Sequence, residues 1–403
     1  MILGAALCNS RDTELHKGKN TKIHKVLWPI LFRIINKFKN FTPFNMKYSF
    51  LIILFFCFSM ASAQNIPLYV GTYTDDGSEG IYRYDFNLKT GELTNKKLAA
   101  EAVNPSFITF SSDKKLLFSV GETDSFEGAK SGFLNSYSVE KDGTLTFINK
   151  VSSNGAHPCH IQLNEDNSKA VVSNYTGGTV SLHTVSKNGL ISQATQVIDH
   201  NKGTLQSHAH SAQFFKNNLF IADLGLNSFS QYQLANTDKK YQLKANYEVP
   251  NNAGPRHFEI SKKGKFIYVI NELNSTISVL KKKKDRYDFV QNISTLNAGF
   301  DGKSFCADIH LSKDGQFLYG SNRGENSIAV FKINKKNGEL QKIQTISTHG
   351  DWPRNFTLSP DGNYLLAANQ RSKNISVYRV DKKNGNLTFL YSIATPTPSC
   401  LLF

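Results

Sequence analysis

A repeat with a spacing of 47 to 53 residues runs through most of the chain and limits the folds open to it. Each copy has an apolar strand-like segment, a turn rich in Asn, Gly or Asp, and a second such segment, as in "IYVINELNSTISVL" from Ile267. The equivalent turn positions are Gly71, Gly121, Asn174, Asp223, Asn271, Asn322 and Asn369. Seven units of several short strands are typical of propeller blades. The repeat therefore predicts an all-β, seven-bladed β-propeller.

The two ends of the repeat region predict how the ring closes. Six units are preceded by a further strand-like segment, such as "GPRHFEISKKGK", but the unit that begins "NIPLYVGTY" is not. The C-terminal "TPSCLLF" resembles the start of that segment and has no unit behind it. We expect this strand to pair with Leu68–Tyr73 and complete the first blade, which would leave no free sheet edge. A β-solenoid could share the repeat, but it would need capped ends.

The segment before the repeats reads as an export signal. In "MKYSFLIILFFCFSMASAQ", Lys47 precedes an apolar run from Phe50 to Phe58, and Ala61-Ser62-Ala63 forms an A-x-A cleavage site. The run is too short to span a bilayer. We predict a signal peptide over 46–63, translation from Met46, an over-called leader over 1–45 and a mature propeller domain over 64–403. The mature protein is expected to be periplasmic or extracellular, without a membrane partner. An amphipathic segment around "VLWPILFRIINKF" is the alternative for the leader.

Charge and cysteine usage exclude several function classes. The formal charge is +15, and residues 64–403 carry +8 of it. Excess lysine without stacking aromatic motifs is a weak sign of nucleic-acid binding, and we expect Lys281–Lys284 to form a solvated hairpin. Cys159, Cys306 and Cys400 form too odd and sparse a set for a disulfide framework. Cys/His spacings suited to zinc do not occur, and we expect no metal or cofactor.

Ionisable residues recur at two positions of the repeat. The stretch "NAGPRHFEISKKGKFIYVINELNS" places Arg256 and His257 before one strand and Glu272 after the next. Antiparallel pairing would bring these ends together at the mouth of the channel. The starts of the innermost strands elsewhere carry His157, His160, His208, His210, Asp308, Arg354 and Asn355, and the ends of the second strands carry Asn174, Asp223, Arg323 and Gln370. Such a polar mouth predicts a ligand site, although a single histidine could serve only to join blades. The turn asparagines are interpreted as structural caps.

Three stretches resemble a known family: "GPRHFEIS…YVINELNSTISV", "ADIHLSKDGQFLYGSNR" and "WPRNFTLSPDGNYLLAANQRSKNISVYRVD". They are similar to the bacterial 6-phosphogluconolactonase family of seven-bladed propellers, which includes fungal carboxy-muconate cyclases. The resemblance covers nearly all of residues 66–403 and implies metal-free lactone hydrolysis or its reverse. It also implies a site of one His, two Arg and one Glu. The matching positions are Arg256 and Glu272, with His210 (or His208 or His160) and Arg354 (or Arg323).

Chemistry suggests roles for these residues. Lactone hydrolysis needs a base to activate water, for which His210 or Glu272 is suited, and a cation for the oxyanion, for which Arg256 is suited. Arg354 or Arg323 with His160 would hold a phosphate or carboxylate, and His208, His257, Asp308 and Asn355 complete the expected binding set. A G-x-S-x-G motif is absent. We expect the Arg256 side chain to point into solvent-filled space and not into a blade core. Alternatives are a non-catalytic propeller that binds a glycan or protein, a muconate-type cyclase and, more weakly, a metal lactonase.

Overall fold

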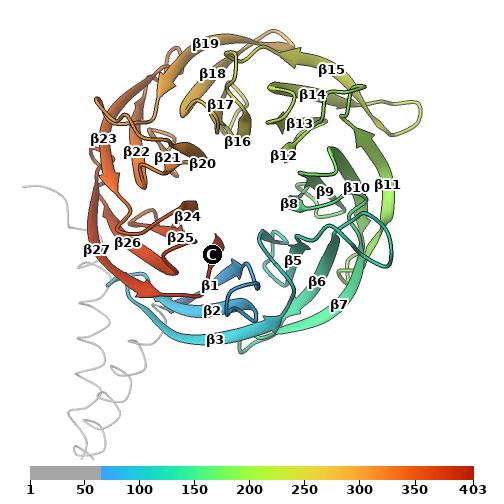
Figure 1. Ribbon diagram of the computed structural model, residues 1–403, viewed down its shortest axis with the longest axis horizontal. Coiled ribbons are helices and arrows are strands. Elements are labelled where there is room, and N and C mark those ends of the chain that lie inside the picture. The colour runs from blue at the N-terminus through green and yellow to red at the C-terminus, as the bar shows by residue number, and fades with distance from the viewer. Residues whose placement is uncertain (1–64) are drawn as a thin grey trace, which may run out of the picture. The chain divides into compact units, whose positions relative to one another are not determined.

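Seven four-stranded antiparallel sheets form a ring around a central channel (Figure 1). The computed structural model describes residues 65–403, so the predicted leader and signal peptide lie outside the described residues. Within 65–403 every regular element is a strand. The prediction of an all-β, seven-bladed propeller is confirmed. Among these residues there is also no helix suited to crossing a membrane.

The blades follow one another in sequence, each running from its innermost to its outermost strand. The first blade consists of β28 (Pro398–Leu402), β1 (Asn65–Thr72), β2 (Gly80–Asn87) and β3 (Leu93–Glu101). The second and third consist of β4 (Ile108–Phe110), β5 (Leu116–Gly121), β6 (Phe133–Val139) and β7 (Leu145–Ser152), then β8 (Pro158–Leu163), β9 (Lys169–Asn174), β10 (Thr179–Val185) and β11 (Ile191–Asp199).

The fourth blade consists of β12 (Ala209–Phe215), β13 (Asn218–Asp223), β14 (Ser228–Leu234) and β15 (Tyr241–Tyr247). The fifth consists of β16 (Pro255–Ile260), β17 (Phe266–Asn271), β18 (Thr276–Lys283) and β19 (Arg286–Ser294). The last two consist of β20 (Phe305–Leu311), β21 (Phe317–Arg323), β22 (Ser327–Ile333) and β23 (Leu340–Ser347), then β24 (Pro353–Leu358), β25 (Tyr364–Asn369), β26 (Asn374–Val380) and β27 (Leu387–Ala394).

The C-terminal strand closes the ring as predicted. Strand β28 pairs antiparallel with β1, with Tyr69 opposite Leu402 and Gly71 opposite Cys400. Cys400 and Leu401 are both buried, so closure covers apolar surface as well as a sheet edge. In Figure 1 the red C-terminal strand lies beside the blue β1.

The apolar core lies between adjacent blades. All six residues of β17 are buried, because the middle strands of a blade have a neighbouring blade on each face. The outer strand β19 has one buried residue, Tyr287, and otherwise meets solvent. One cluster joins Tyr364 and Leu366 of the seventh blade to Leu68 and Tyr84 of the first, so the closing interface is packed like the others. Each large apolar side chain buried in this way contributes about 1.5–3 kcal/mol.

The asparagine that recurs at one turn position of the repeat has a structural role. Asn174, Asn271, Asn322 and Asn369 are fully buried. The side-chain amide of each donates a hydrogen bond of 3.0–3.1 Å to a Thr or Ser hydroxyl of the next strand, at its first residue in three blades and at its third, Ser376, in the seventh. The predicted capping role is confirmed. In the fourth blade Asp223 takes this place and accepts hydrogen bonds from Ser207 and from the backbone of His208 and Leu226.

Candidate active site

A β-bulge at the start of the innermost strand sets the direction of three predicted catalytic side chains. The pairing of β16 with β17 shifts between Pro255 and His257, so Arg256 is the extra residue. Equivalent shifts single out His210 in β12 and Arg354 in β24. A bulge turns one side chain away from the normal alternation. A proline begins β16 and β24, where the missing N–H costs the ladder nothing.

Arg256, Glu272 and Arg323 form a buried ion cluster, as the repeat positions predicted for the first two. Oε2 of Glu272 lies 3.0 Å from Nε of Arg256 and 2.8 Å from Nη2 of Arg323. Arg256 also donates to the carbonyl of Ala307 in the next blade. Burial raises the pKa of Glu272, but the charges of Arg323 and Arg256 outweigh it and hold this pKa below its usual value. Glu272 is therefore an anion that is shared by two guanidinium groups, and the three-residue cluster keeps a net positive charge.

The expected orientation of Arg256 toward solvent was wrong. Its residue exposure is 1%, and it is among the largest fully buried side chains. The bulge turns it into the wall of the channel, where its Nε lies 3.0 Å from Glu272 and its Nη1 donates to the carbonyl of Ala307. Sequence spacing placed the residue at the correct end of the strand but could not show how closely the neighbouring blade approaches.

A small cavity lies beside Arg256 at the mouth. Arg256 and Arg354 line it together with Ser106 and Ser399, so the fifth, seventh, second and first blades all contribute. The remaining lining residues are Phe107, Cys159, His257 and Asn355. Burial, with the charge of Glu122, raises the pKa of the Cys159 thiol, although Arg256 and Arg354 oppose this. The thiol is therefore protonated at neutral pH and is a poor nucleophile.

Three predicted histidines, His160, His210 and His257, lie close together near the innermost strands. The ring of His257 lies 5.1 Å from that of His210 and 5.7 Å from that of His160, and the ring of Phe107 lies 4.6 Å from that of His160 in a tilted arrangement. All three histidines are buried. Burial lowers the pKa of His257 to about 4, helped by the charge of Arg256. Burial also lowers the pKa values of His160 and His210 well below the usual range. All three rings are neutral at pH 7.

Asp308 and Asn355 link neighbouring blades beside His257. Oδ1 of Asp308 lies 2.7 Å from Nδ1 of His257, and Oδ2 accepts a hydrogen bond from the amide of Asn355. Asn355 also accepts one from the backbone of Leu401 in the closing strand. Oδ2 of Asp308 lies 3.0 Å from Nε2 of His310. The binding role of Asp308 and Asn355 stays a prediction. These contacts show that both residues also join neighbouring blades.

Two other predicted binding residues lie toward the rim. His208 stacks on Tyr175, with ring centroids 4.5 Å apart, and its Nδ1 lies 3.0 Å from the carbonyl of Tyr175. Arg323 is held by Glu272 and lies 5.0 Å from the ring of Trp352. Neither residue lines the small cavity, nor do His160, His210 and Glu272, and contact of all these residues with substrate stays a prediction.

The structure adds a second carboxylate that sequence reasoning missed. Oε2 of Glu122 accepts hydrogen bonds from Tyr73, at 2.7 Å, and from Ser106, while Oε1 lies 3.9 Å from Arg354. The guanidinium of Arg354 also lies 5.2 Å from the ring of Tyr73. A signal was present in the repeat, because Glu122 follows Gly121 as Glu272 follows Asn271. The mouth thus contains two arginine–glutamate groups, from different blades.

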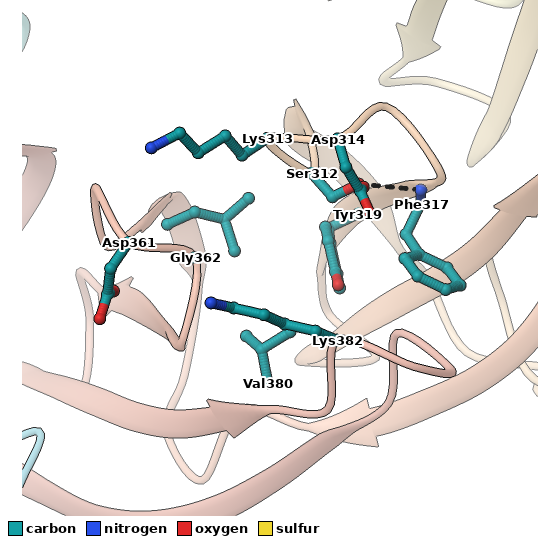
Figure 2. A pocket seen from close by; sticks show the side chains of 10 residues that line it. Ser312, Lys313, Asp314, Phe317, Tyr319, Asp361, Gly362, Val380 and Lys382 are labelled. Carbon is teal, nitrogen blue, oxygen red and sulfur yellow. Dashed lines mark hydrogen bonds between the residues drawn. The ribbon is translucent and has the colours of Figure 1, made fainter. Parts of the chain in front are cut away.

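A groove elsewhere on the propeller is larger but lacks this chemistry. It lies between the sixth and seventh blades, at the turns that follow β20 and β24, with about 640 Å³ of empty volume (Figure 2). Phe317, Tyr319, Leu358 and Val380 contribute apolar surface, and Lys313 and Lys382 flank it. These turns lie at the opposite end of the blades from Arg256 and Glu272. Within residues 65–403 no His, Cys, Asp and Glu cluster is arranged to hold a metal ion.

Seven closed blades and a mouth of arginine, glutamate and neutral histidine define a β-propeller with a polar channel site. Residues 67–403 match the family described as "Lactonase, 7-bladed beta-propeller". The chain belongs to this family of lactonase propellers.

Named relatives agree with this assignment. The chain is 33% identical to the 6-phosphogluconolactonase of Bacillus subtilis over 298 residues, 72% of this chain and 83% of the relative. It is 34% identical to that of Formosa agariphila over 308 residues, covering 72% and 86%. The solved periplasmic gluconolactonase of Pseudomonas aeruginosa shares 32% identity and a TM-score of 0.78, with 83% and 98% covered. The proteins so named are lactone hydrolases.

Proposed function

We propose that this protein is an exported, metal-independent lactonase that hydrolyses a sugar-acid lactone at the channel mouth. The convergence of Arg256 and Arg354 on one small cavity carries the proposal, because two guanidinium groups from different blades can face one carbonyl. Family membership supports lactone hydrolysis. Export is supported by the A-x-A site after the apolar run and by the periplasmic name of one solved relative.

Arg256 has the oxyanion role in this proposal. Attack of water on the lactone carbonyl places negative charge on the carbonyl oxygen, and preorganised donors stabilise that charge. Glu272 fixes the guanidinium of Arg256 through Nε, and the carbonyl of Ala307 fixes it through Nη1. These positive groups supply the polarisation that a bound cation would otherwise provide. Arg354 would bind the carboxylate that forms as the ring opens.

His210 has the base role. Its ring is neutral at pH 7, whereas Glu272 is already paired with two arginines. A water oxygen bonds to the carbonyl carbon while His210 takes the water proton. The tetrahedral intermediate then breaks the bond between the carbonyl carbon and the ring oxygen. The leaving ring oxygen takes the proton back from His210, so the product is the open hydroxy acid and the histidine is regenerated.

Glu122 positions Arg354 in the same scheme. Tyr73 and Ser106 fix one carboxylate oxygen, and the other faces the guanidinium. The arrangement parallels that of Glu272 with Arg256 and Arg323. Two carboxylates thus restrain three arginines, so the cations are held in place before substrate arrives.

A pH-stat assay of residues 64–403 with phosphorylated and unphosphorylated sugar lactones tests the proposal. Acid release that is proportional to enzyme and absent from the Arg256→Ala variant is expected. Saturable binding without turnover would favour a propeller that only binds its ligand. Loss of ultraviolet absorbance from an unsaturated acid, without lactone hydrolysis, would favour a cyclase. A full rate after exhaustive treatment with chelator is expected, and loss of activity restored by a metal would contradict metal independence.

A further inference from the structure

The charge of the propeller is divided between its two ends. The connections between strands at the mouth end carry a net charge of −6, and those at the opposite end carry +5. Two adjacent blades, the fifth and the sixth (Figure 1), dominate the positive end. The segments 261–265, 281–288, 312–316 and 332–339 contain twelve Lys or Arg and four Asp or Glu, a net of +8. This equals the net charge of the whole of residues 64–403.

These four segments form one basic surface, and we call it the lysine face. Pairing of Phe266 with Lys281, and of Phe317 with Lys332, places them all at the end of the blades opposite the mouth. The ammonium group of Lys265 lies 3.3–3.4 Å from the carbonyls of Lys335 and Lys336, which joins the two blades. At the boundary with the seventh blade, Lys313 of the sixth blade and Lys382 of the seventh flank the groove (Figure 2).

The lysine face is only partly neutralised from within. Lys283 lies 3.2 Å from Asp288 in an ion pair. The carboxylate of Asp285 is engaged by Lys244 from the fourth blade, at 3.7 Å, and that of Asp314 by Ser312 and Gln316. Most of the lysines, including Lys262, Lys263, Lys282 and Lys284, are exposed. Like charges at this density repel one another, so an anionic partner would be favoured.

We propose that the lysine face attaches the protein to an anionic lipid surface, with the mouth directed away from it. Eleven of the twelve cations are lysines, with Arg286 the exception, and lysine is a point charge suited to diffuse phosphate groups. The one aromatic ring in the four segments, Tyr287, is buried, so the face has no stacking platform for bases. The turns lie side by side at one end of the ring. The sequence alone predicted no membrane partner, and the folded arrangement of these lysines leads to the opposite proposal.

Vesicle co-sedimentation of residues 64–403 tests this directly. Vesicles of phosphatidylcholine with about 30% phosphatidylglycerol should bind the protein at least tenfold more tightly than pure phosphatidylcholine. Binding should weaken steeply between about 50 and 300 mM salt, because the screening length shortens. Changing Lys262, Lys263, Lys282 and Lys284 to Glu should abolish binding. The matched control changes Lys130, Lys150, Lys202 and Lys303, which are also exposed, to Glu and should bind like the parent.

Several results would overturn the proposal. One is equal binding to neutral and anionic vesicles. Another is binding that is retained after Lys262, Lys263, Lys282 and Lys284 are changed to Glu. A third is an equal loss of binding in the control variant when thermal melts show that both variants are folded. Tighter binding of heparin or duplex DNA than of anionic vesicles would replace the lipid partner with a soluble polyanion. Lactonase activity is not part of this test, so its outcome is independent of the proposed function.

Discussion

Replacing Arg256 with alanine separates the catalytic role of this residue from its structural one. The guanidinium contacts Glu272, the carbonyl of Ala307 and the cavity at the mouth. Removal of one preorganised oxyanion donor reduces turnover by about 10²–10³-fold. We expect this loss in kcat and in kcat/KM alike, because the interaction is made with the charge that develops in the transition state.

The same change should also reduce stability. It leaves the carbonyl of Ala307 without this donor and removes one of the two arginines that neutralise buried Glu272. An orphaned buried group costs about 1–3 kcal/mol, and breaking a buried ion pair costs about 3–5 kcal/mol when no partner remains. Because Arg323 remains, we expect a total near 2–4 kcal/mol. That corresponds to a decrease in Tm of roughly 4–8 °C.

A matched variant controls for lost stability. His200→Ala removes a buried side chain that lies 3.0 Å from Asp223 and 2.9 Å from the hydroxyl of Tyr232. It should lower the Tm by a similar amount and leave kcat nearly unchanged, because the ring of His200 is held by Asp223 and Tyr232 within the fourth blade. Both variants are assayed at 20 °C, below either transition. Turnover of Arg256→Ala within threefold of the parent would refute the oxyanion assignment.

Three further predictions follow from particular contacts. Because burial holds the pKa of His210 well below the usual range, kcat/KM should stay constant from pH 7.5 to 5.5 and fall only at lower pH; a midpoint near 6.5 would exclude His210 as the base. Asp308 and Glu259, acting against burial, raise the pKa of His310 to about 10. The stabilisation that protonated His310 provides is fully present below about pH 6.5 and is lost as the pH rises toward 10. The Tm should therefore fall by a few degrees over that range, and the dependence of Tm on pH should flatten in His310→Gln. Deletion of residues 396–403 exposes β1 as an edge and should cause aggregation in light scattering; a soluble protein with the parent Tm would contradict closure.

The fold could be predicted because the repeat and its turn residues reflect contacts that are made within single blades. In four of the seven blades a buried asparagine at the turn, such as Asn271, donates a hydrogen bond to a hydroxyl of the next strand, so this residue type recurs in the sequence. Closure was predictable because "TPSCLLF" continues the pattern of the innermost strands. Each of these signals lies within one blade or at a chain end, where periodicity is informative.

The site was only partly predictable because its contacts cross blades and depend on bulges. Arg256 and Glu272 belong to paired strands, so their proximity followed from the spacing. Burial of Arg256 did not, because Ala307 in the next blade and the bulge together produce it. Glu122 was missed because its partners, Tyr73 and Arg354, lie 49 and 232 positions away. A comparison of every blade at the position after the turn would have identified it.

The most direct measurement of the central claim is a crystal structure with the product of the preferred lactone, an open sugar acid, bound to residues 64–403. We expect the carboxylate of the bound product within hydrogen-bond distance of both Arg256 and Arg354, and its hydroxyl groups toward His210 and Glu122. Product bound only in the groove at Lys313 and Lys382, with the mouth empty at saturating concentration, would contradict the assignment of the active site.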